Sequence, residues 1–184
     1  MIREYAYDIM PEIQKRYATK NFSSRPVSRE ALLPLVEAAR YAPSCYNEQP
    51  WRYLLGDDPK THEKLARCLV PGNAWAKDAP VLILALCTHA FRRNGRENPY
   101  GRFDTGTATG FLQLEAIRRG FAVHCMAGFD AELARKEFGI GEDLDVIAML
   151  ALGYSADLDA LDPEKRKLEN PGTRNPLNSL LLNP

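Results

Sequence analysis

The chain has 184 residues, and its 24 Lys plus Arg are balanced by 24 Asp plus Glu. Hydrophobic residues make up 45% and charged residues 26%, a composition typical of a domain with its own core. This composition excludes collagen-like repeats and a disordered chain. Proteins that bind nucleic acids or anionic membranes usually carry excess positive charge, so the balance argues against both functions.

The cysteines show no metal-binding spacing. Cys45, Cys68, Cys87 and Cys125 form no C-x-x-C pair and no close cluster with histidine. We therefore expect reduced, mostly buried thiols and no metal site. The first residues contain no apolar stretch of the secretory kind, and the longest apolar run, residues 81–87, is far below the roughly 20 residues that span a bilayer. We expect a cytoplasmic protein.

Hydrophobic periodicity predicts helices and strands along the first 154 residues. The predicted helices are residues 7–17, 29–41 after a Ser28 cap, a helix opened by Asp58-Pro59, 104–119, and 131–138 after an Asp130 cap. The predicted strands are residues 51–55, 80–87, 121–126 and 144–154. Pro34 should kink the second helix or shift its start. This order of elements predicts an α+β fold with helices packed around one sheet.

Beyond residue 154 the sequence loses its periodicity. This part of the chain is rich in proline and still ends in an apolar tip containing Leu177, Leu180, Leu181 and Leu182. Apolar side chains on a loose arm need a surface to bury against, and a partner subunit is one candidate.

Four segments carry residue types suited to a bound ligand. Arg and Lys within residues 15–20 suit a phosphate and a delocalised anion, although a solvated basic helix end is the simpler explanation. Residues 41–51 are dense in side-chain amides and hydroxyls, which can also form a well-capped turn. The small residues 105–108 suit close packing. Residues 126–130 join a strand to a helix start, where backbone N–H groups are free to donate.

In order and spacing, these segments resemble the FMN-dependent nitroreductase family. The matching motifs are Lys15-Arg16-x-x-x-Lys20-x-Phe22, Ala42-Pro43-Ser44-x-x-Asn47-x-Gln49-Pro50-Trp51, Asp104-x-Gly106-x-Ala108 and Gly128-Phe129-Asp130. The Pro-Ser-x-x-Asn-x-Gln-Pro-Trp block is the most specific of them. The resemblance implies one domain over residues 1–184, folded as an α-β-α sandwich with a central mixed sheet. Residues 155–184 would form an extended arm that reaches the partner subunit.

The resemblance also implies a homodimer with FMN bound at the subunit interface. By position, the cofactor-binding residues of one subunit would be Arg16, Tyr17, Ala18, Lys20, Asn73, Ala127, Gly128 and Arg174. The neighbouring subunit would contribute Pro43, Ser44, Cys45 and Asn47. Arg174, and Arg16 or Lys20, would hold the phosphate or ribityl chain, and Lys20 would lie near the N1–O2 edge of the ring. Backbone N–H groups of Ala127 and Gly128 would point towards N5.

Three departures from the family pattern affect this site. Gly172 stands where a second late cation is common, so Lys165, Arg166 or Lys167 would help to bind the phosphate. Ala18 replaces an early serine, and Ala127 replaces a residue that is often acidic. The stretch before residue 104 is short and carries Arg92, Arg93, Arg96 and Arg102. These arginines would face either the substrate or the solvent.

The implied activity is hydride transfer from NADH or NADPH, through N5 of the flavin, to a nitroaromatic, a quinone or a similar small acceptor, with ping-pong kinetics. The cofactor would do the chemistry, so no side chain is assigned as a catalytic acid or base. Alternatives are a different flavin reaction, such as enone reduction, dehydrogenation or dehalogenation, a non-catalytic flavin-binding module, and a flavin-free scaffold.

Overall fold

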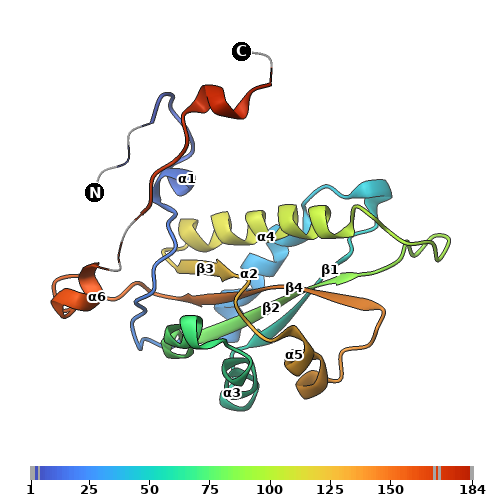
Figure 1. Cartoon of the computed structure of the whole chain (residues 1–184), viewed down its shortest axis with the longest axis horizontal. Coiled ribbons are helices and arrows are strands. Elements are labelled where there is room, and N and C mark those ends of the chain that lie inside the picture. Colours follow the sequence, from blue (N-terminus) through green and yellow to red (C-terminus); the bar gives the residue numbers. More distant parts are fainter. Residues whose placement is uncertain (1–2, 4, 168, 170, 183–184) are drawn as a thin grey trace.

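Four strands form one sheet in the computed structural model, which describes residues 3, 5–167, 169 and 171–182. Residues 1–2, 4, 168, 170 and 183–184 lie outside the described part, and with them the last residues of the predicted arm. The strands are β1 (Trp51–Gly56), β2 (Val81–Thr88), β3 (Ala122–Met126) and β4 (Leu144–Gly153), in the order β1-β2-β4-β3 (Figure 1). None of the helices that the structure describes has the length and apolar character needed to cross a membrane.

Every neighbouring pair in this sheet is antiparallel. The prediction of a mixed sheet was therefore wrong, and the topology gives the reason. β2 and β3 run in the same direction and are joined by the crossover helix α4 (Gly101–Arg118), an arrangement that suggests parallel pairing. The last strand, β4, lies between them and runs the opposite way, so β2 and β3 never pair directly.

Side chains from both faces of the sheet are buried in separate cores. Residues Val81, Ile83 and Ala85 of β2 pack with α2 (Arg29–Arg40) and α4, whereas the alternate residues Leu82, Leu84 and Leu86 pack on the other side. That second side is covered by α3 (Pro59–Arg67), the 3₁₀ helix Pro71–Asp78 and α5 (Ala131–Phe138). A strand buried on both faces has no polar alternation, which is why β2 is a continuous apolar run. The predicted α-β-α sandwich is confirmed.

Three predicted helix starts are confirmed by their caps. The side chains of Ser28, Asp58 and Asp130 accept hydrogen bonds from backbone N–H groups three residues further along, at 3.4, 3.0 and 2.8 Å respectively. α2 begins directly after Ser28 and keeps Pro34 inside it, so the proline does not shift the start of the helix.

Two other helix boundaries differ from the prediction. The first helix is α1 (Pro11–Lys15), much shorter than residues 7–17. Pro11 occupies its first turn because proline has no N–H to donate and its ring clashes with a preceding helical turn. Arg16 is already extended, with φ −68° and ψ 121°, so the segment that follows is an extended chain. α4 begins at Gly101, three residues earlier than residue 104.

The C-terminal arm contains only a short helix α6 (Pro163–Lys167) and a 3₁₀ helix, Leu177–Leu180. It runs beside the N-terminal segment and away from the sheet (Figure 1). Its leucines are exposed, with 67% of Leu180 accessible to solvent. Within the described chain the apolar tip therefore finds no surface to bury against.

All four cysteines are free, as expected for reduced thiols. Cys68 and Cys87 are buried, Cys45 is half-buried and Cys125 is exposed, so only half of them lie in the core.

Candidate functional site

The extended segment 16–22, which we call the basic strand although it is not one of the four strands of the sheet, lies along the edge strand β3. A ring nitrogen of His124, Nδ1, lies 2.8 Å from the carbonyl oxygen of Thr19. His124 also packs against Trp75, with ring centroids 4.6 Å apart, and Trp75 stacks on Phe22. Burial lowers the pKa of His124, and the cations Lys20 and Arg16 add to this effect. A neutral histidine therefore fixes the segment that carries Arg16, Tyr17, Ala18 and Lys20.

Arginines from three segments meet beside this strand. One terminal nitrogen of Arg3, Nη1, donates to the carbonyl of Arg16 at 2.7 Å, and Nη2 donates to the carbonyl of Pro171. Burial lowers the pKa of Arg16, and the positive charges of Arg3 and Arg174 lower it further. Within the described part of the chain none of the three forms an ion pair with a carboxylate. Like charges gathered without a counterion favour binding of an anion.

Glu169, which no sequence motif marks, joins the C-terminal arm to the segment 16–22. Its Oε1 accepts hydrogen bonds from the backbone N–H of Lys20 at 3.0 Å and from the amide Nδ2 of Asn21 at 2.7 Å. Burial, followed by the negative charge of Glu169, raises the pKa of Tyr17. No motif marks Glu169, because its role depends on a contact between segments far apart in the sequence.

Asn73 and the 127–128 turn are brought together next to β3. The amide Nδ2 of Asn73 donates to the carbonyl of Gly128 at 3.0 Å, and the N–H of Val70 donates to the same oxygen at 3.4 Å. A Cβ at Gly128 would lie 2.5 Å from Asn73 Nδ2, so the turn has no room for a side chain. The turn is thus held through its carbonyl, and the N–H groups of Ala127 and Gly128 take no part in these bonds.

The second predicted group, residues 43–49, forms a tight polar loop before β1. The hydroxyl of Ser44 accepts the N–H of Gln49 at 3.0 Å, and the buried carboxylate of Asp104 accepts the N–H of Cys45 at 2.9 Å. Positive φ angles occur at Tyr46 (52°), Asn47 (57°) and Gln49 (51°). Non-glycine residues in this region store backbone strain, which is commonest at ligand-binding sites.

The two groups of predicted residues lie at opposite edges of the sheet. Pro43, Ser44, Cys45 and Asn47 precede β1, whereas Arg16 to Lys20, Asn73, Ala127, Gly128 and Arg174 gather on the β3 side. Within one chain the structure does not bring them together. α4 extends across the sheet between them (Figure 1).

The small residues of α4 split between two faces. Thr105, Ala108 and Thr109 are buried against the sheet and α2. A Cβ added to Gly106 or Gly110 would meet no described atom within 4 Å. Phe103 and Phe111, on the same helix, are 76% and 39% exposed. The close packing expected at Gly106 is therefore not provided by the described residues of this chain.

The arginine-rich stretch is held to the polar loop through its backbone, while the side chains of Arg92, Arg93, Arg96 and Arg102 are exposed. The carboxylate of Glu48 accepts the N–H groups of Arg92 and Arg93 at 2.8 and 3.4 Å. The guanidinium of Arg93 lies 3.6 Å from the ring centroid of Tyr46. Arg102 instead pairs with Asp145 at 3.1 Å.

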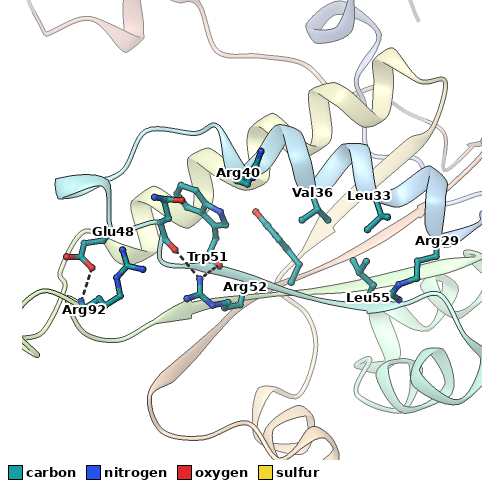
Figure 2. A pocket seen from close by; sticks show the side chains of 11 residues that line it. Arg29, Leu33, Val36, Arg40, Glu48, Trp51, Arg52, Leu55 and Arg92 are labelled. Atoms are coloured by element: carbon teal, nitrogen blue, oxygen red, sulfur yellow. Dashed lines mark hydrogen bonds between the residues drawn. The ribbon is translucent and has the colours of Figure 1, made fainter.

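A groove of about 500 Å³ lies between α2 and the outer edge of β1. Figure 2 shows Leu33 and Val36 of α2 facing Leu55 of β1, with arginines around the rim. None of the predicted cofactor-binding residues lines it. The groove is therefore separate from both groups, although it adjoins the polar loop through Glu48 and Gln49. Among the residues described, no three His, Cys, Asp or Glu side chains are grouped so as to hold a metal ion.

The family model described as "Nitroreductase family" matches residues 13–74 and 69–154, which contain both groups except Arg174. The chain belongs to the nitroreductase family. The predicted family is thereby confirmed.

Relatives agree with this assignment over most of the chain. A solved structure described as an oxidoreductase containing FMN superposes with a TM-score of 0.90 at 27% identity, covering 98% of this chain and 94% of that one. A nitroreductase family protein from Clostridium difficile gives a TM-score of 0.74 at 26% identity, covering 95% and 97% of the two chains. An NADH dehydrogenase from Thermus thermophilus is 26% identical over 78% of this chain and 84% of its own length.

Proposed function

We propose that this member of the nitroreductase family is an FMN-dependent oxidoreductase that moves hydride from NADH or NADPH to a nitroaromatic, a quinone or a similar small acceptor. The observation that carries the proposal is that Arg174 of the arm comes close to Arg16, on the segment that also carries Lys20, and that neither arginine forms an ion pair with a carboxylate among the described residues. The description of one solved relative as containing FMN, and the name NADH dehydrogenase of another, support the choice of cofactor and donor.

The residues present fit FMN. Arg16 and Arg174 would hold the phosphate, because a guanidinium fork matches phosphate oxygens and keeps its charge at every working pH. The amide of Asn73 and the backbone N–H groups of Ala127 and Gly128 would face the ring, since the turn leaves those N–H groups out of its own bonds. Because Gly128 has no side chain, the amide of Asn73 can lie close to the backbone of the turn.

When bound, FMN supplies the two-electron chemistry, accepting hydride from the nicotinamide and passing it to the acceptor. The chain's own contribution is electrostatic and steric. Lys20 would provide positive charge where negative charge develops in the ring, and its backbone is fixed by Glu169. The neutral His124 holds the same strand without adding a competing charge.

We further propose that the site is completed by a second copy of the chain. The polar loop 43–49 and the basic strand lie at opposite edges of one sheet, so a single flavin reaches both only if they come from different subunits. Gly106 and Gly110 leave a close-packing face of α4 uncovered, with Phe103 exposed beside it. The arm would bury its leucines on the partner, and the groove between α2 and β1, with Leu33, Val36 and Leu55 in its lining, offers it an open strand edge.

The test is the absorption spectrum of the purified protein, followed by anaerobic addition of NADH or NADPH. We expect a bound FMN spectrum that bleaches and then recovers when a quinone or nitroaromatic is added. Flavin that does not bleach with either nicotinamide would instead indicate a binding module or a different donor. A colourless protein that takes up no added FMN would refute the proposed function.

A further inference from the structure

We propose that Arg3 acts with Arg16 and Arg174 as a third cation for the phosphate of the flavin, in place of the late cation that Gly172 cannot provide. This inference rests on the proposed function and deepens it. Arg3 lies near the start of the chain and belongs to none of the motifs that resemble the family.

The geometry places Arg3 at the junction of three segments. Its guanidinium donates to the carbonyl of Arg16 on the basic strand and to the carbonyl of Pro171 on the arm. Pro171 directly precedes Gly172, and a Cβ on Gly172 would lie 3.6 Å from Nη1 of Arg174. Arg3 therefore lies beside the position where the family pattern has its second late cation.

Arg3 retains donors after making these two bonds. Each terminal nitrogen of a guanidinium carries a second N–H, and the Nε–H of Arg3 is buried without an acceptor among the described residues. A buried donor left unpaired is costly unless a ligand satisfies it. An anion held between Arg16 and Arg174 would lie within the positive field of Arg3 and would relieve the repulsion among the three.

Two of the three other candidate cations, Arg166 and Lys167, make bonds elsewhere. Arg166 donates to the carbonyl of Leu158 and pairs with Asp159 at 3.2 Å, and Lys167 pairs with Glu164 at 2.6 Å. These bonds connect α6 to residues 158–159 and link two side chains within α6 itself. The expectation that Lys165, Arg166 or Lys167 replaces the missing cation is therefore not supported for Arg166 and Lys167 and stays a prediction for Lys165, whereas Arg3 contacts the backbone of Arg16 itself.

The test compares FMN with riboflavin, which lacks only the phosphate. Apoprotein of the wild type, Arg3→Gln and Arg3→Lys is titrated with each flavin while flavin fluorescence is followed. We expect Arg3→Gln to weaken FMN binding by about tenfold, the size of one lost charge-assisted contact, with riboflavin binding unchanged. Arg3→Lys should recover part of the loss, and Arg166→Gln is the control that leaves both affinities as in the wild type.

Two results would overturn the inference while leaving the proposed function intact. One is an Arg3→Gln protein that binds FMN as tightly as the wild type. The other is an equal loss for both flavins, because a purely structural role would not change the ratio of the two affinities. A wild type that binds neither flavin overturns the proposed function as well. Melting temperatures are measured first, and if the Gln variant is unfolded, the same ratio in Arg3→Lys decides.

Discussion

The carboxylate of Asp104 accepts the backbone N–H of Cys45 at 2.9 Å and thereby ties the first turns of α4 to the polar loop 43–49. Asp104 is almost fully buried, and its position near the start of the helix is favourable for a negative charge. This bond supports a loop whose backbone is strained at three non-glycine positions, Tyr46, Asn47 and Gln49. The strained loop therefore depends on a residue in a different element.

Removing this acceptor should loosen the loop. We predict that Asp104→Ala lowers the free energy of unfolding by about 1–3 kcal/mol, because it leaves the N–H of the half-buried Cys45 unpaired, and lowers the FMN content of the purified protein. Chemical denaturation and the flavin-to-protein absorbance ratio measure the two effects. Asp78→Ala, at an exposed acidic residue, is the matched control. Equal stability of the two variants would contradict the role given to Asp104.

A single methyl group should disturb the turn at residues 127–128. In Gly128→Ala the new Cβ would lie 2.5 Å from Asn73 Nδ2, so Asn73 must move or the turn must shift. We predict a stability loss of about 1–3 kcal/mol and weaker FMN binding. Gly72→Ala, one residue before Asn73, has nothing within 4 Å of the new methyl group and should change stability by less than about 0.5 kcal/mol. Thermal unfolding with and without FMN separates the two variants.

Loss of the arm should abolish the dimer and the flavin together. We predict that a chain ending at Asn175, which lacks the exposed leucines, is monomeric and colourless. Leu33→Asp places a charge among the apolar side chains of the groove and should have the same effect if the partner's arm lies there. Sedimentation or light scattering gives the mass, and absorbance gives the flavin. A truncated protein that stays dimeric and yellow would exclude the arm as the dimer contact.

Lys20 should contribute more to FMN binding and flavin reduction than Lys15, the other lysine of its motif. We predict that Lys20→Ala weakens FMN retention or slows reduction of the bound flavin by about tenfold or more, because a positive charge beside the developing negative charge is lost. Lys15→Ala, in the last turn of α1, should behave as the wild type. Anaerobic stopped-flow reduction by NADH and the flavin dissociation constant are the two measurements. Unchanged retention and an unchanged rate together would remove Lys20 from the site.

His124 should make the stability of the fold depend on pH. Burial depresses the pKa of His124 in the folded protein, so the unfolded chain takes up the proton first. Stability is then full above the ordinary histidine pKa of about 6.5 and falls as the pH drops below it. Arg16 and Lys20 increase the depression, whereas Glu169 and the Thr19 carbonyl oppose it.

The measurement is the melting temperature of the apoprotein between pH 7.5 and 5.5. We expect His124→Asn, whose amide can still donate to the Thr19 carbonyl, to show a smaller decrease than the wild type. His89→Asn, at an exposed histidine, should keep the slope of the wild type. Identical slopes for all three proteins would show that His124 is not the responsible group.

Features of the fold that depend on neighbouring residues were predicted correctly from the sequence. The caps at Ser28, Asp58 and Asp130 and the double-sided apolar run of β2 are local signals, and each is present as predicted. The insertion of β4 between β2 and β3 could not be predicted, since strand order depends on which surfaces pair across long separations. The helix predicted over residues 7–17 is longer than α1, because hydrophobic periodicity does not register the restriction that Pro11 places on the start of a helix.

Motifs mark the residues predicted for the candidate site, and the structure shows where they lie, while their role in binding stays a prediction. Arg16, Asn73 and Gly128 lie on the β3 side, where the family resemblance expects one subunit's share of the site. Arg3 and Glu169 were missed because each acts through a carbonyl or an N–H of a distant segment, and such contacts leave no pattern in residue spacing.

The central position of β4 also bears on how the chain is assembled. β1 and β2 can pair as soon as both have been synthesised, but β3 pairs in this sheet only with β4. The pairing of Val81 with Leu152 closes one of the longest loops in the sheet, which is the kind of contact that slows folding. A nascent chain that stops after α5 therefore has a hairpin-like half-sheet and an unsupported basic strand. The edge strand β3, beside which the arginines lie, joins the sheet only after β4 has been synthesised.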